Sequence, residues 1–245
     1  MCKEKLQIEQ ESVRLSQVKE IAVCFLRQPI IKTEIPFVVV HPFYASPFFN
    51  NPGTNKVVNI LEFAEGKKQA EQMFQSLIMG QDTIESVVSI VRRPYQLTFL
   101  RYIKPFLTQE EFSKLLGSIY VYSENPNDDP NVPLKMLRSW FSSAIKTDLM
   151  TEEEYMVYSD LPERFTIYRG VGVGRVRDGL SWTRDLSEAT WFANRFNNKK
   201  EHGYILEAEI DKKDVFAYFK QEKEIVCYPK RNTIHMLANN RKKLS

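Results

Sequence analysis

Two glutamates, Glu222 and Glu224, stand immediately before the apolar run 225–228. On an extended strand, residues two apart point to the same face, so both carboxylates are expected to project together. Like charges held this close destabilise each other unless a substrate or partner uses them. The pair therefore indicates a functional site.

Two upstream segments carry polar side chains suited to the same site. Arg169 ends a strand-like run, where its guanidinium matches phosphate oxygens bidentately, and Gly170 after it lets backbone approach a ligand. A surface arginine in a turn is the alternative. Ser181 and Thr183 place hydroxyls on one face of a short strand, with Trp182 on the other. The alternative is that these hydroxyls only form a solvent-exposed strand face. An arginine, a Ser/Thr pair and a Glu-x-Glu in this order suggest a site for an anionic, sugar-containing ligand.

Several familiar catalytic patterns are absent. The glycines of 170–174 lack the GK[ST] ending and a following periodic helix, which excludes a P-loop or Rossmann motif. Ser181 does not lie in the Gly-x-Ser-x-Gly nucleophile elbow of hydrolases, because Thr183 occupies the position of the second glycine. No metal is expected, because the histidines are isolated: His41, His202 and His235.

Aromatic residues flank these positions. Phe192 and Phe196 share one face of a helix expected to start near Asp185, either as core or with a ring stacked on a flat cationic heterocycle. Tyr218 and Phe219 immediately precede the charged segment 220–222, which suits them to substrate recognition or to burial under a sheet edge.

Composition and patterning indicate one cytoplasmic α+β protein. The net charge of +3 is too small to argue for nucleic-acid binding, and three cysteines without CxxC spacing indicate a reducing compartment. No signal peptide or transmembrane segment is apparent. Helical patterns occupy 1–28 and 66–122, and a capping box at 151–154 opens another helix. Strands are predicted afterwards, near 165–169, 179–183, 203–210, 214–218 and 224–228.

In their order, Arg169, Ser181 and the Glu222/Glu224 pair resemble the Arg–Ser–Glu class of ADP-ribosyltransferases, typified by cholera-like and clostridial C2-like toxins. The resemblance covers roughly residues 130–230. In that family the arginine holds the phosphates of NAD, a Ser-Thr-Ser motif braces the site, and the Glu-x-Glu ends a mobile loop. This chain has Ser-Trp-Thr at 181–183 in place of Ser-Thr-Ser.

The resemblance implies an ADP-ribosyltransferase-like fold, with helices first and then a split antiparallel or mixed β-sheet core around an NAD cleft. It places this domain at 66–245, with the catalytic strands in 163–230, and leaves 1–65 as an accessory region of unknown role. Phe192 would lie against the nicotinamide, and Phe219 or Tyr218 would recognise the target. The implied NAD-binding residues are Arg169, Gly170, Ser181, Thr183 and Phe192.

The implied activity is transfer of ADP-ribose from NAD to a macromolecular acceptor, either a protein arginine or an RNA or DNA base. Glu224 would bind the ribose 2′-hydroxyl and stabilise the developing positive charge, while Glu222 would deprotonate the acceptor. Such a protein would act as a toxin, phage effector or phage-defence protein, with a neutralising antitoxin as a possible partner and no membrane association. The alternatives are a non-catalytic NAD- or nucleotide-binding interaction module on a degenerate transferase fold, and a phage structural protein.

Overall fold

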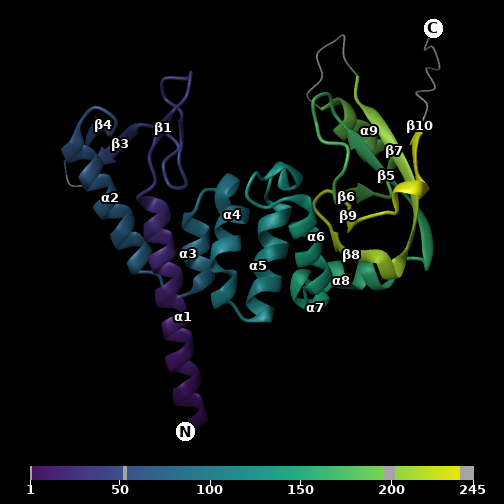
Figure 1. Cartoon of the computed structure of the whole chain (residues 1–245), viewed down its shortest axis with the longest axis horizontal. Coiled ribbons are helices and arrows are strands. Elements are labelled where there is room, and N and C mark those ends of the chain that lie inside the picture. Colours follow the sequence, from purple (N-terminus) through teal and green to yellow (C-terminus); the bar gives the residue numbers. More distant parts are fainter. Residues whose placement is uncertain (1, 52–53, 196–201, 238–245) are drawn as a thin grey trace. The chain divides into compact units, whose positions relative to one another are not determined.

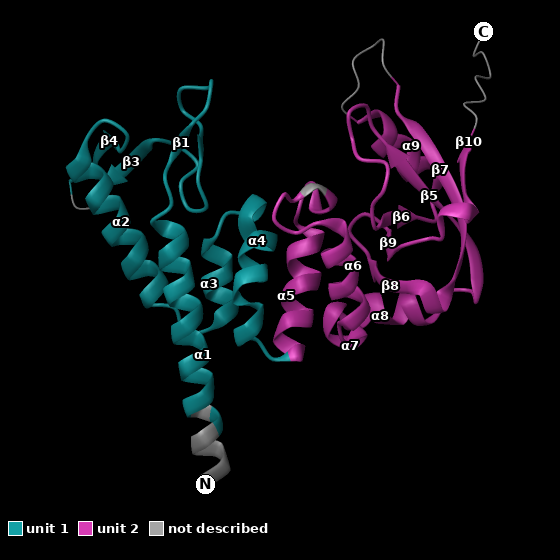
Figure 2. Ribbon diagram, viewed as in Figure 1, with its two compact units in different colours: residues 1–108 teal, residues 109–245 magenta. Residues whose placement is uncertain are grey.

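The computed structural model describes residues 2–51, 54–195 and 202–237 (Figure 1). The chain divides into two compact units, residues 1–108 and 109–245 (Figure 2). The sequence instead suggests a boundary near residue 65. All the candidate site residues belong to the second unit.

The first unit is built on a long N-terminal helix, α1 (Cys2–Leu26). Its buried side chains, among them Val18, Ala22 and Leu26, pack against helices from the expected helical region. These helices are α2 (Ala64–Met79), α3 (Ile84–Ile90) and α4 (Arg93–Ile103), followed by the 3₁₀ turn η1 (Lys104–Phe106). Two small antiparallel sheets pair β1 (Ile31–Lys32) with β2 (Val39–Val40) and β3 (Phe48–Asn51) with β4 (Lys56–Asn59).

The second unit begins with helices. They are α5 (Gln109–Val121), the 3₁₀ turn η2 (Pro126–Asp128), α6 (Leu134–Ser143), α7 (Lys146–Leu149) and α8 (Glu152–Ser159). The capping box predicted at the start of α8 is confirmed, because Thr151 accepts a hydrogen bond from the Glu154 amide and the Glu154 carboxylate accepts one from the Thr151 amide. None of the described helices is long and apolar enough to cross a membrane.

A six-stranded sheet follows, in the order β10-β7-β5-β6-β9-β8, and each pair of neighbours is antiparallel. Helix α9 (Leu186–Asn194) packs on β5 and β7. The α+β class predicted from the sequence is therefore confirmed. The strands are β5 (Arg164–Val171), β6 (Ser181–Thr183), β7 (Tyr204–Asp211), β8 (Val215–Phe219), β9 (Glu224–Cys227) and β10 (Ile234–Leu237), with 3₁₀ turns η3 (Lys212–Asp214) and η4 (Arg231–Thr233).

The sheet is weakly joined at its centre, between β5 and β6. Strand β5 pairs with β7 along its whole length, from Arg164 opposite Asp211 to Val171 opposite Tyr204. With β6 it shares a single residue pair, Tyr168 opposite Thr183. The two strands therefore separate beyond this pair, where β5 ends and β6 begins.

Candidate active site

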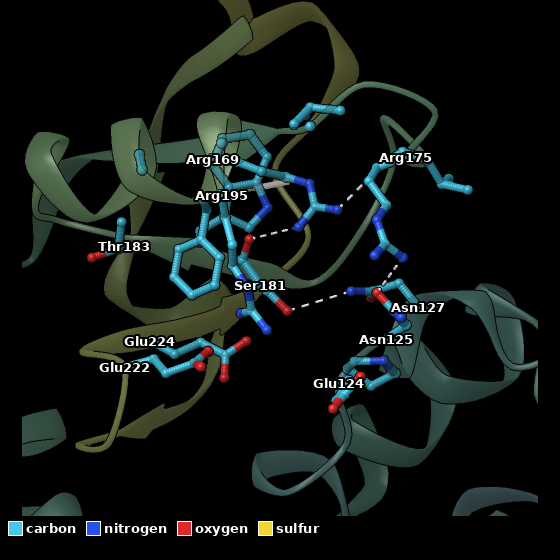
Figure 3. A pocket seen from close by; sticks show the side chains of 18 of the residues that line it. Glu124, Asn125, Asn127, Arg169, Arg175, Ser181, Thr183, Arg195, Glu222 and Glu224 are labelled. Atoms are coloured by element: carbon cyan, nitrogen blue, oxygen red, sulfur yellow. Dashed lines mark hydrogen bonds between the residues drawn. The ribbon is translucent and has the colours of Figure 1, made fainter. Parts of the chain in front are cut away.

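A pocket in the second unit lies where β5 and β6 separate (Figure 3). Its walls come from β5, β6, α9, the end of α5 with the loop that follows, and the turn before β9. It brings together the sequence-predicted residues Arg169, Ser181, Phe192, Glu222 and Glu224. These residues are spread over more than fifty positions of the chain, and the sheet order alone makes their strands neighbours.

Glu224 is the first residue of β9 and lies between two strands. It pairs with Thr183 on β6 and with Phe219 on β8, which leaves the residue only 9% exposed. Burial raises the pKa of this carboxyl from its ordinary 4.5 to about 7. Hydrogen bonds from Ser181 and Tyr120 and the positive charge of Arg169 favour the ionised form and offset part of this rise. The group therefore exchanges between its neutral and charged forms near neutral pH.

The hydroxyl of Ser181 lies at the centre of a small network. It is 2.7 Å from the hydroxyl of Tyr120, a fully buried residue of α5, and the carboxyl of Glu224 bonds to both hydroxyls. The side-chain amide of Asn127 donates to the same Ser181 oxygen at 3.4 Å, while its Oδ1 accepts from the Leu180 amide at 2.9 Å. Helix α5 and the loop after it thus hold β6 in place, a role that the sequence analysis did not assign to either.

Arg169 spans the gap between β5 and β6 with its side chain. Its Nη1 donates to the Ser181 carbonyl at 2.8 Å, its Nε to the Arg177 carbonyl at 3.1 Å, and its Nη2 to the Val176 carbonyl at 3.3 Å. Gly179 makes room for it, since a Cβ there would lie 2.4 Å from Nη2. The guanidinium expected to bind phosphate therefore also holds the 176–181 loop in place through hydrogen bonds to its backbone.

Two more arginines line the pocket and were not singled out from the sequence, Arg175 and Arg195. Nη1 of Arg175 donates to Oδ1 of Asn125 at 2.7 Å, which links the 172–178 turn to the loop after α5. Arg195 follows the end of α9, and its guanidinium carbon is 5.8 Å from the centre of the Phe192 ring. Both sit among ordinary surface charges in the sequence, so only the fold reveals their convergence.

Glu222 reaches the pocket by a different route from the one the sequence predicts. It lies in the turn between β8 and β9, where the Lys223 amide donates to the Lys220 carbonyl at 3.2 Å and Lys223 has a left-handed φ of 47°. The prediction that both glutamates share one strand face is therefore wrong, yet both line the pocket (Figure 3). Partial burial raises the pKa of Glu222. The positive charge of Arg195 lowers this pKa, and the negative charge of Glu188 raises it further.

Two expected ligand contacts, Thr183 and Gly170, and the neighbouring Trp182 line the pocket and also have structural partners. Thr183 is buried and its hydroxyl accepts from the Asp185 amide at 3.1 Å, in the turn that leads into α9. Gly170 lets α9 approach the sheet, since a Cβ on it would be 2.0 Å from the Ala189 carbonyl oxygen. Trp182 packs in the core cluster and donates its indole N–H to the Gly179 carbonyl at 3.1 Å.

The aromatic candidates divide between pocket and core. Phe192 is half-buried and lines the pocket, whereas Phe196 lies outside the described residues. Phe219 is part of β8 rather than of a loop, is only 2% exposed, and has its ring 6.1 Å from that of Tyr120. Tyr218 is half-buried against the core cluster. The structure therefore favours burial over target recognition for Phe219.

Within the described part of the chain, no group of three or more His, Cys, Asp or Glu side chains is placed to hold a metal ion. Comparison of the chain with protein-family models, with curated proteins and with solved structures found no match. The residues of the pocket are therefore the basis on which a function can be proposed.

Proposed function

We propose that this protein is an NAD-dependent mono-ADP-ribosyltransferase with an ADP-ribosyltransferase-like fold in its sheet-bearing unit. One observation carries the proposal. Arg169, Ser181 and Glu224 come from three strands that are adjacent in the sheet, β5, β6 and β9, and they meet in one pocket with Glu222 and Phe192. This is the arrangement that the Arg–Ser–Glu resemblance requires.

The carboxyl of Glu224 suits the bond that must break. Departure of nicotinamide from the ribose leaves an oxocarbenium-like carbon, and a carboxylate held beside it stabilises that charge. Glu224 has a pKa of about 7 in the folded chain. The positive nicotinamide ring of NAD would lower that pKa, so binding of the dinucleotide would itself favour the ionised carboxylate.

The remaining residues would position the two substrates. The guanidinium groups of Arg169 and Arg175 line the pocket and supply positive charge for the diphosphate, and the half-buried ring of Phe192 would contact the nicotinamide. Glu222 stands at the pocket edge, with its carboxyl partly exposed to solvent, where it can take a proton from an incoming nucleophile. In the cell, we place such an enzyme in the cytoplasm as a toxin, phage effector or defence protein acting on a macromolecule.

The test is incubation of the purified chain with NAD labelled in its adenylate moiety, in a cell lysate, with nicotinamide release measured in parallel. Wild type is expected to release nicotinamide and transfer label, and Glu224→Ala is expected to lose both by at least about a hundredfold, the scale of one stabilising group in a transition state. Glu163→Ala, at an exposed carboxylate just before β5, is the matched control and should behave as wild type.

Separate protease and nuclease digestion of the labelled product then assigns the acceptor class. If wild type neither releases nicotinamide nor transfers label, although wild type and Glu224→Ala bind NAD equally, the enzyme proposal is refuted. That result would favour a non-catalytic NAD-binding module.

A further inference from the structure

Two loops form the side of the pocket that lies across from the two glutamates (Figure 3). They are the loop after α5, residues 123–127, which we name the α5 loop, and the 172–178 turn between β5 and β6. Nη1 of Arg175 in the turn donates to Oδ1 of Asn125 in the α5 loop at 2.7 Å. Because this bond joins the two loops, a group that enters here can contact both of them at once.

The α5 loop lends the pocket four polar residues, and the fold itself uses three of their side chains. Ser123 donates to a carbonyl of α5 at 2.8 Å, Asn125 accepts from Arg175, and Asn127 bonds to β6. Glu124 is the exception. It lines the pocket, is exposed, and has no side-chain hydrogen bond or ion pair within the described part of the chain. Since residues on both sides of it are held, the loop presents this carboxylate to the pocket with its oxygens available to a ligand.

The 172–178 turn adds apolar surface and positive charge to the same side of the pocket. Val173 and Val176 both line the pocket, yet they are 45% and 46% exposed, so a flat apolar group could still cover them. Arg175 lies between them in the sequence and supplies a guanidinium that suits a phosphate. Apolar surface, a guanidinium and the Glu124 carboxylate match the three parts of a nucleotide, which are its base, its phosphate and the hydroxyls of its ribose.

We propose that the adenosine half of NAD binds between the α5 loop and the 172–178 turn, and that Glu124 bonds to its ribose 2′-hydroxyl and thereby selects NAD over NADP. This inference rests on the proposed function. A carboxylate accepts hydrogen bonds from the neighbouring hydroxyls of a ribose. The 2′-phosphate of NADP cannot donate in the same way and would place a second negative group against Glu124. Glu124 is thus a specificity residue that takes no part in the bond that breaks.

The order of the chemical groups along NAD agrees with this placement. Under the proposed function the nicotinamide ribose lies at Glu224 and the diphosphate lies at Arg169 and Arg175. The adenosine ribose follows the diphosphate, so it continues beyond the arginines and away from Glu224. Figure 3 shows Glu124 on that side, across the pocket from Glu224. The sequence gives no sign of this role, because Glu124 lies in a stretch whose composition predicts only a loop.

The experiment compares NAD with NADP on the full chain by nicotinamide release and by calorimetric titration. Wild type should prefer NAD in both assays by about tenfold to a hundredfold, the range of one hydrogen bond to a charged group. Glu124→Gln keeps the size of the side chain but removes its charge, so the preference should fall to about threefold or less, chiefly through tighter binding of NADP. Glu124→Arg should bind NADP more tightly than NAD.

The reaction itself should be nearly unaffected by these changes. In Glu124→Gln the kcat for NAD should stay within about twofold of wild type, because the interaction at the adenosine ribose is the same before and during bond breaking. Glu163→Gln, at an exposed carboxylate just before β5 that does not line the pocket, is the matched control. It should keep the wild-type preference for NAD.

The two assays separate the adenosine site from the proposed function. Equal kcat/KM for NAD and NADP in wild type, or a preference that is unchanged in Glu124→Gln, would overturn the role of Glu124 and leave the NAD-cleaving activity standing. Absence of nicotinamide release from both dinucleotides would refute the proposed function. Titration would then decide the site, since a preference for NAD that depends on Glu124 would support it, and equal binding or no binding would overturn it.

Discussion

Replacing Glu224 by glutamine should stabilise the second unit in a way that depends on pH. The carboxyl is buried and has a pKa of about 7 in the folded chain, against an ordinary value of 4.5 in an unfolded one. Glutamine keeps the shape of the side chain but carries no charge at any pH. The substitution therefore isolates the free energy of holding this carboxylate in the fold.

The sign follows from which state loses its proton first. Below about pH 4.5 both states hold the proton, so the carboxyl adds no pH dependence. Between 4.5 and about 7 the unfolded chain ionises while the folded chain does not, and the free energy of unfolding falls as pH rises. Each pH unit across that interval costs about 1.4 kcal/mol, so wild type should lose about 3 kcal/mol between pH 4 and pH 8.

Denaturant titration followed by tryptophan fluorescence measures this loss. Trp140, Trp182 and Trp191 are the chain's only tryptophans and all belong to the second unit, so the signal reports that unit. Glu224→Gln should match wild type near pH 4 and exceed it by about 3 kcal/mol at pH 8. Such a gain on removing a site residue is typical of a trade between stability and activity.

The control is Glu163→Gln, at an exposed carboxylate of the same unit, which should track wild type at both pH values. Parallel stability curves for wild type and Glu224→Gln between pH 4 and pH 8 would refute the reasoning. That result would mean that Glu224 is solvated in the folded chain and ionises as an ordinary glutamate does.

Two further substitutions test the supports of the pocket. Tyr120→Phe removes a hydrogen bond that lowers the pKa of Glu224. The acidic limb of the pH profile for nicotinamide release should therefore move to higher pH. An unchanged acidic limb would show that the Tyr120 hydroxyl does not act on Glu224. Gly179→Ala would put a Cβ 2.4 Å from Nη2 of Arg169 and displace the guanidinium. Calorimetric titration should then show NAD binding weakened by about tenfold or more, the scale of a charged hydrogen bond, and an unchanged affinity would show that Arg169 does not hold the dinucleotide.

Local patterns were sufficient to predict most of the sheet. The alternation of Phe165, Ile167 and Val171 marks β5, and these side chains are buried in the core cluster. The same period of two places Val215, Ala217 and Phe219 together on the buried face of β8. Applied strictly, the pattern would have assigned Phe219 to the core. Strand β10 was not predicted, and its partly exposed residues do not alternate in burial.

The parts of the site that the sequence did not reveal depend on contacts between distant residues. Tyr120 reads as one more apolar position of α5, and its bond to Ser181 joins residues 61 positions apart. Asn127 lies in a stretch whose composition predicts only a loop, yet it bonds to Leu180 and Ser181. Glu222 was misplaced because Lys223 adopts a left-handed conformation without the glycine or asparagine that usually signals one.

The weakest pairing in the sheet and its least favourable buried charge occur at the same place, and this coincidence supports a functional site. Strands β5 and β6 share one residue pair, and beyond it the side chain of Arg169 takes the place of strand pairing. Across the gap, Glu224 is held beside Tyr120 and Ser181 by hydrogen bonds that only partly offset its burial. A sequence selected for stability alone would extend the backbone hydrogen bonding between β5 and β6 and would place an apolar residue at position 224. Features that cost stability are expected to lie together in one pocket when a bound ligand compensates for them. A dinucleotide would do so under the proposed function, because its anionic phosphates would pair with the arginine and its cationic ring with the carboxylate.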